Sequence, residues 1–162
     1  MTSRRWGIVV GVALVALFIC AGFLNAEAWL MGSLASTVGL MGTLVALVAW
    51  PVHGVWLGLT QRERAQVWRF PVMFWTAVVV LAVGGWLLVT AGPASTVSGG
   101  LSVLGGAALF LGTAPLHGLS RLTGISGSLP LVVGMSVVVL AVSLLASYLA
   151  RRMSAGGTST SQ

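Results

Sequence analysis

Five long segments of the chain contain no charged residue, and this feature limits the possible folds more than any other. A helix needs about 20 mainly apolar residues to cross the ~30 Å hydrocarbon core of a bilayer. Backbone groups in lipid must bond within their own segment, so we predict helices despite the many β-branched valines. The predicted helices cover residues 6–24, 28–50, 70–91, 96–114 and 129–150.

The composition argues against a soluble domain. Hydrophobic residues make up 57% of the chain and charged residues 6%, whereas soluble domains carry about 25% charged residues. A net charge of +6 can indicate nucleic-acid binding, but the arginines stand at the ends of apolar segments instead of forming one basic face. We therefore expect the lipid bilayer as a partner, together with another membrane protein or a second copy of the chain, and no nucleic acid.

The fold class that follows is all-α, a polytopic transmembrane bundle of five helices. Residues 1–152 form a single transmembrane domain in this prediction, and residues 153–162 form a disordered polar tail. A cytoplasmic N-terminus then leaves Arg151 and Arg152 outside and Arg121 inside. The alternative is four spans, in which the glycine-rich fourth segment is re-entrant and these three arginines change sides. Charge slightly favours four spans, but a sequence repeat leads us to prefer five.

The N-terminal segment has two interpretations. Arg4-Arg5, an apolar stretch and Ala26-Glu27-Ala28 together resemble a secretory signal peptide with its cleavage site. We expect an uncleaved first helix instead, because the stretch is long and another apolar segment follows at once. We predict a multi-pass protein of the plasma membrane with a cytoplasmic N-terminus.

Tryptophans mark the ends of several segments. Trp6, Trp29, Trp50 and Trp68 stand at or near segment ends, where the headgroup region of a bilayer favours the amphipathic indole ring. Trp75 and Trp86 stand deeper in their segment, and we predict that they pack against other helices or face lipid.

Both histidines occur in the same four-residue motif. Pro51-Val52-His53-Gly54 follows the second segment, and Pro115-Leu116-His117-Gly118 follows the fourth. Each motif precedes a polar loop and then a proline, Pro71 or Pro130, that opens the next segment. Proline ends or kinks a helix and glycine permits a turn. The pattern predicts two repeated helical hairpins after an N-terminal helix.

The two histidines are the candidate cofactor-binding residues. The plainer hypothesis is that His53 and His117 each cap a helix end, where a cation is favourable. The sharper hypotheses are that they lie symmetrically and share a ligand, or that they act in gating or proton sensing. Two imidazoles can hold a haem iron but are too few for structural zinc, so we predict no metal site.

The apolar segments contain no carboxylate or other base that could serve catalysis or ion pumping. Small residues spaced four apart, such as Ala108 and Gly112, favour close helix packing. We expect no catalytic residues and no enzyme activity. The function expected is an accessory or structural membrane subunit that acts by helix packing. The alternatives are a small transporter or channel built on the duplicated hairpin, and a haem- or quinone-associated redox protein.

Overall fold

The protein is a bundle of helices, as the apolar segments predict. The computed structural model describes residues 3–60, 64–91, 96–125 and 129–156, and these contain helices and turns but no strand. The described helices are α1 (Ser3–Leu24), α2 (Ala26–Leu30), α3 (Thr37–Thr60), α4 (Arg64–Ala91), α5 (Thr96–His117), α6 (Ser120–Thr123) and α7 (Leu129–Gly156).

Three of the described helices are long and apolar enough to cross a membrane. These segments are Thr37–Thr60 in α3, Arg69–Thr90 in α4 and Leu129–Ser154 in α7. The described apolar parts of α1 and α5, Ile8–Leu24 and Val103–His117, are shorter. The helix lengths and apolar surfaces therefore indicate a membrane protein.

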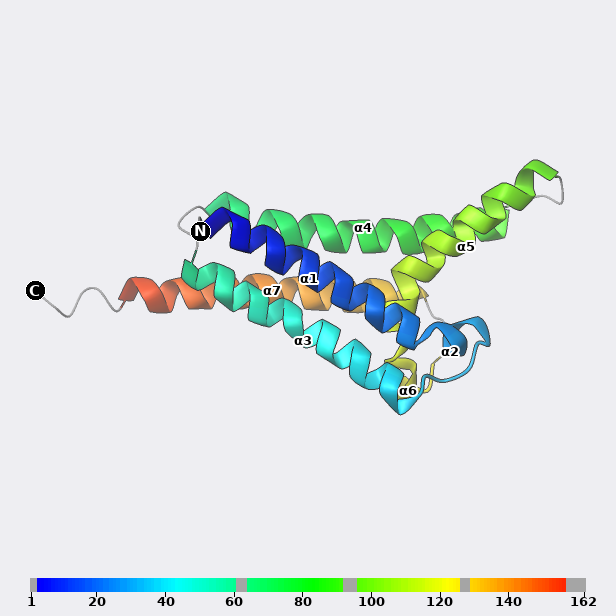
Figure 1. Ribbon diagram of the computed structural model, residues 1–162, viewed down its shortest axis with the longest axis horizontal. Helices are drawn as coiled ribbons and strands as arrows, with labels where there is room; N and C mark the ends of the chain where they lie inside the picture. The colour runs from blue at the N-terminus through cyan, green and yellow to red at the C-terminus, as the bar shows by residue number, and fades with distance from the viewer. Residues whose placement is uncertain (1–2, 61–63, 92–95, 126–128, 157–162) are drawn as a thin grey trace, which may run out of the picture.

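Four helices run along the long axis of the bundle (Figure 1). Helices α1, α3, α4 and α7 alternate in direction, so the start of α1 and the end of α7 lie at one end, which we call the terminal end. The other end, called the distal end, holds α2, α6, the start of α3 and the start of α7. Most of the turns and short helices are thus gathered at the distal end.

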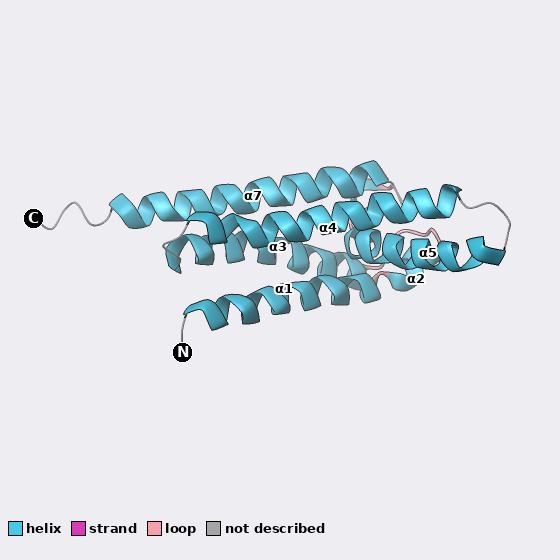
Figure 2. Cartoon of the chain, turned by 90° about the horizontal axis from the view of Figure 1, so that it is seen from above, coloured by secondary structure: helices cyan, strands magenta, loops and turns pink. Residues whose placement is uncertain are grey.

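Helix α5 does not follow this pattern, because both of its ends lie towards the distal end (Figures 1 and 2). It runs back along the last part of α4, where Gly105 faces Leu88 and Gly112 faces Ala82. It then ends beside α1 and the first turns of α3, with Pro115 against Gly22. Helix α5 therefore covers only the distal part of the bundle.

The predicted helix over residues 28–50 is wrong at both ends. The chain leaves the helical conformation after α2, Gly32 adopts a positive φ of 61°, and α3 begins at Thr37. Helix α3 then continues through Pro51 to Thr60. A proline removes one helical hydrogen bond, and here the packing of α3 along α7 holds the helix on both sides of it.

The predicted pair of repeated hairpins is not confirmed. Helix α4 packs along α5 and α3 packs along α7, whereas α3 with α4 and α5 with α7 make only small contacts. Helices α5 and α7 both begin towards the distal end, so they do not form an antiparallel pair. The disordered tail predicted from residue 153 is wrong for residues 153–156, because α7 extends to Gly156. The rest of the predicted tail, residues 157–162, lies outside the described residues.

An aromatic layer fills the middle of the bundle. Trp50 lies 4.5 Å from Phe74 and 5.5 Å from Trp75 between ring centroids, and Phe18 meets Trp75 edge-on at 5.6 Å. Trp50 and Trp75 are each 1% exposed. The packing role predicted for Trp75 is confirmed. The headgroup position predicted for Trp50 is wrong, because α3 continues past it and places its ring in the core.

Helices α3 and α7 meet along a seam of small residues. Gly54 and Gly58 of α3 face Ser143 and Ser147 of α7. A Cβ atom built on Gly54 would lie 2.5 Å from the Ser143 carbonyl oxygen, and one on Gly58 would lie 2.5 Å from that of Ser147. The Ser147 hydroxyl donates a hydrogen bond of 2.9 Å to the Gly54 carbonyl. Glycine at these positions lets the two backbones touch.

We expect Gly54→Ala to destabilise the bundle, because its new methyl group has no room beside the Ser143 carbonyl. Overpacking of this kind costs about 1–3 kcal/mol, more than the ~1 kcal/mol that alanine gains over glycine within a helix. The control is Gly134→Ala on α7, where a Cβ meets no atom within 4 Å. SDS titration in mixed micelles, followed by tryptophan fluorescence, measures both unfolding free energies. Equal stability of the two variants would contradict a tight seam.

Candidate functional site

His53 lies within α3, surrounded by aromatic rings. It is 5% exposed, and its ring stacks on Trp56 at 5.9 Å and meets Phe70 edge-on at 6.1 Å. Its Nδ1 atom is buried without a hydrogen-bond partner in the described part of the chain. His53 does not cap a helix end, because α3 continues past it to Thr60.

His117 is the last residue of α5 and is 6% exposed. Its Nε2 atom lies 2.8 Å from the backbone carbonyl oxygen of Ser33, in the loop between α2 and α3. A carbonyl oxygen only accepts hydrogen bonds, so Nε2 must carry the hydrogen. This bond ties the end of α5 to a loop that is distant in sequence.

The structure does not bring the two histidines together. The Thr43 hydroxyl reaches the Pro115 carbonyl near His117, whereas His53 lies about 15 Å further along α3 at about 1.5 Å per residue. His53 lies near Phe70, towards the terminal end, and His117 lies at the distal end. One iron cannot bind both imidazoles at this separation. Among the described residues, no three His, Cys, Asp or Glu side chains form a group that could hold a metal ion.

A buried network of polar side chains supplies a hydrogen-bond donor to a backbone carbonyl at the end of α5. The Thr43 hydroxyl donates a hydrogen bond of 2.8 Å to the Pro115 carbonyl, and the Asn25 amide donates to the Thr43 oxygen at 3.0 Å and to the Ala21 carbonyl at 2.8 Å. Asn25 and Thr43 are both 0% exposed. The last carbonyls of a helix lack partners within that helix, so other side chains must supply the donors when the end is buried.

The sequence analysis missed both residues of this network. Asn25 follows directly after the first apolar segment, and Thr43 lies inside the second. A polar side chain in such a position is costly to bury without a partner, and this cost was the signal that could have revealed them.

A second set of bonds holds the loop between α2 and α3 at the distal end. The Ala35 amide donates to the Ser120 hydroxyl at 3.0 Å, and the Arg121 guanidinium donates to the Ala35 carbonyl at 3.3 Å. Together with the bond from His117 to Ser33, these contacts form what we call the distal clamp. Through His117, the second copy of the histidine motif thus connects the end of α5 to the loop between α2 and α3.

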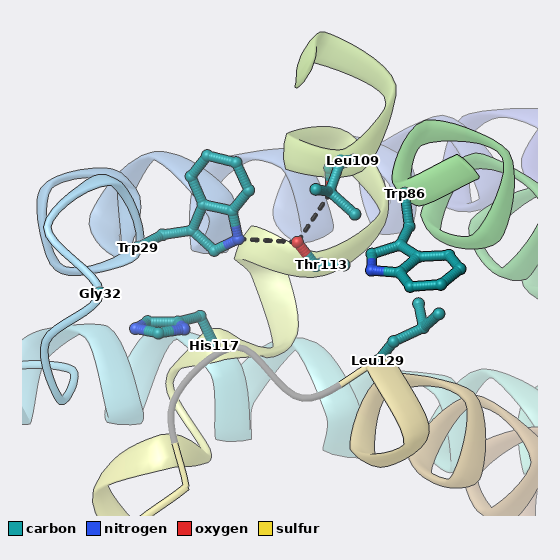
Figure 3. A pocket seen from close by; sticks show the side chains of 7 residues that line it. All are labelled: Trp29, Gly32, Trp86, Leu109, Thr113, His117 and Leu129. Carbon is teal, nitrogen blue, oxygen red and sulfur yellow. Dashed lines mark hydrogen bonds between the residues drawn. The ribbon is translucent and has the colours of Figure 1, made fainter. Parts of the chain in front are cut away.

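A pocket of about 230 Å³ opens beside the distal clamp (Figure 3). The indole of Trp29 lies close to the imidazole of His117, and Trp86 and Leu129 lie on the other side of Thr113. The Trp29 Nε1 donates to the Thr113 hydroxyl at 2.7 Å, which in turn donates to the Leu109 carbonyl at 2.7 Å. The residues that line the pocket are Trp29, Gly32, Trp86, Leu109, Thr113, His117 and Leu129.

No protein family, no curated protein and no solved structure matches this chain.

We expect Thr43→Val to destabilise the protein. The valine is nearly isosteric but leaves the Pro115 carbonyl without its donor, and an unpaired buried group costs about 1–3 kcal/mol. The control is Thr90→Val, because the exposed Thr90 hydroxyl bonds only to carbonyls of its own helix. Thermal unfolding in detergent, followed by circular dichroism, compares the two variants. A Thr43→Val midpoint equal to that of Thr90→Val would refute the capping role.

Phenylalanine substitutions should show that the two histidines contribute differently to the stability of the protein. His53 lies among aromatic rings, and its buried Nδ1 has no hydrogen-bond partner among the described residues. Because His53→Phe removes this nitrogen, we expect unchanged or higher stability. His117→Phe deletes the bond to Ser33, and we expect a loss of about 0.5–1.5 kcal/mol. The same unfolding assay measures both variants. A larger loss for His53→Phe than for His117→Phe would contradict this assignment.

Proposed function

We propose that the chain is a non-catalytic integral membrane subunit, which acts by packing against another membrane protein or a second copy of itself. The observation that carries the proposal is the closed interior of the bundle. The aromatic layer around Trp50 and Trp75 fills its centre. A filled core of this kind supports a structural role better than a conducting one.

The polar groups inside the bundle also support this proposal. The hydroxyls of Ser136 and Ser143 donate to carbonyls of their own helix, at 2.8 and 2.7 Å. At the distal end, Ser120 Oγ, Thr43 Oγ1 and His117 Nε2 are likewise bonded to backbone atoms. General acid–base chemistry needs a titratable group within reach of a substrate, and the buried hydroxyls described here are committed to structure.

The outer faces of the long helices offer surface for lipid or a partner helix. On α4 the exposed residues include Met73 and Val80, and on α7 they include Val138 and Leu145. Large apolar faces of this kind suit lipid chains and the helices of another membrane protein equally well.

We further propose that α1, α3, α4 and α7 cross the membrane and that α5 is re-entrant. The described helices carry Arg4, Arg69 and Arg151 at the terminal end, whereas Arg121 lies at the distal end. The positive-inside rule then assigns the terminal end, with the N-terminus, to the cytoplasm of a plasma membrane. This is the four-span alternative of the sequence analysis, and the course of α5 favours it over five spans.

A second candidate is a small transporter for an apolar or neutral solute, because α5 ends within the bundle next to a pocket. Interrupted helices at membrane depth recur at transporter binding sites. Because the aromatic layer fills the centre of one chain, such a path would run between copies of the chain and not through a single copy. The redox alternative loses its support, since the two histidines lie apart.

Cysteine labelling tests the four-span topology. In a Cys20→Ser background, we expect Ser154→Cys to react with an impermeant maleimide only from the cytoplasmic side, and Thr123→Cys only from the opposite side. Both positions are exposed, so the reagent can reach them. Five spans would reverse both results, which makes the pair of variants decisive. The labelling is measured by mass shift on intact and inverted membrane vesicles.

Purification and flux measurements test the subunit role. We expect the protein in mild detergent to elute as a complex of fixed stoichiometry, with a second membrane protein or with itself. We also expect liposomes containing it to release glycerol and urea no faster than protein-free liposomes. Light scattering gives the mass of the peak, and stopped-flow scattering gives the flux. Flux above the protein-free rate would favour the transporter, and a monomer without flux would contradict both candidates.

A further inference from the structure

The pocket at the distal end has apolar walls and lies where a bilayer ligand could enter. It lies between α2, α4, α5 and α7, with Trp29 and Leu109 on its walls. Tryptophan side chains favour the headgroup level, and Trp29, which stands near the end of an apolar segment, lines this pocket. In the four-span topology the pocket therefore opens near the membrane surface, beside the upper part of the lipid chains.

In the described part of the chain, two ring nitrogens of the lining side chains are available to a ligand, Nδ1 of His117 and Nε1 of Trp86. The Thr113 oxygen already accepts from Trp29 and donates to Leu109. The Nε2 hydrogen of His117 is committed to the Ser33 carbonyl. In the neutral imidazole the hydrogen on Nε2 leaves Nδ1 as an acceptor, and Nδ1 has no partner in the described part of the chain. The complementary ligand group is therefore one that donates a hydrogen bond to Nδ1 and can also accept one from the Trp86 indole, as a hydroxyl does.

The charges around the pocket narrow the ligand class further. None of the lining residues is a lysine, arginine, aspartate or glutamate, and the nearby Arg121 guanidinium donates to the Ala35 carbonyl in the distal clamp. A phosphate or carboxylate would find no cation among these lining residues. A neutral hydroxyl on an apolar chain fits both the walls and the acceptor. At about 230 Å³ the pocket is smaller than the ~300–1,000 Å³ typical for whole ligands, so it suits the end of a chain.

We propose that this pocket binds the hydroxyl end of a neutral long-chain alcohol from the bilayer. The hydroxyl donates to Nδ1 of His117, and the adjoining methylene groups lie between Trp29 and Trp86. Because Nε2 remains bonded to Ser33, the ligand occupies the pocket without opening the distal clamp. This proposal does not depend on the subunit role, because a structural subunit and a transporter could equally hold such a lipid.

Binding is tested with dodecanol and with dodecyl methyl ether, which has the same chain but no hydroxyl hydrogen. The full-length protein in detergent is titrated with each compound, and native mass spectrometry counts the bound molecules. We expect the alcohol to bind roughly tenfold more tightly, as the loss of one hydrogen bond predicts. In His117→Phe this preference should disappear. Equal binding of the two compounds to the unmodified protein would overturn the proposal.

A matched pair of tryptophan variants tests the location without altering the clamp. Leu129→Trp fills the pocket from its wall, whereas Leu122→Trp adds the same side chain on α6 at a position that is 64% exposed. We expect the first variant to lose dodecanol binding by roughly tenfold or more and the second to keep it. Equal dodecanol binding in the two variants would place the ligand elsewhere and refute the proposed site.

Discussion

The structure depends on one constraint, which is that every backbone group in an apolar interior needs a hydrogen-bond partner. Helix α5 ends inside the bundle and leaves carbonyl groups that its own residues cannot satisfy. The Thr43 hydroxyl reaches the Pro115 carbonyl, and the Asn25 amide holds that hydroxyl in place. Helix α5 can stop inside the bundle because these donors come from its neighbours, and the position of the pocket follows from this end.

Close packing provides the second level of organisation. Glycines of α3 and serines of α7 bring two backbones into contact, and the aromatic layer fills the wider space between α1, α3 and α4. The bundle thus has a filled centre, and a pocket at the distal end that His117 helps to line. The functional proposals rest on that contrast between the two regions.

The long apolar segments predicted the helices well, because a sequence shows directly where lipid-compatible stretches lie. They did not predict which helices pair. Pairing depends on which faces meet, and the contact of Gly54 with Ser143 joins segments that are far apart in the chain. The break after α2 was also missed, since residues 31–36 carry no charge and take their shape from bonds to His117 and Ser120. The roles of Asn25 and Thr43 required the same long-range information.

The two histidine motifs show why similar local sequences can adopt different structures. In both copies the proline removes one helical hydrogen bond. A helix can still continue through the proline when its contacts with neighbouring helices stabilise it enough. After Pro51, Gly54 and Gly58 must remain helical to meet α7, so α3 continues. After Pro115, the Leu119 amide bonds instead to Leu116, and the carbonyl of Pro115 passes to Thr43. The partners of each motif, and not its four residues, decide whether the helix continues or turns.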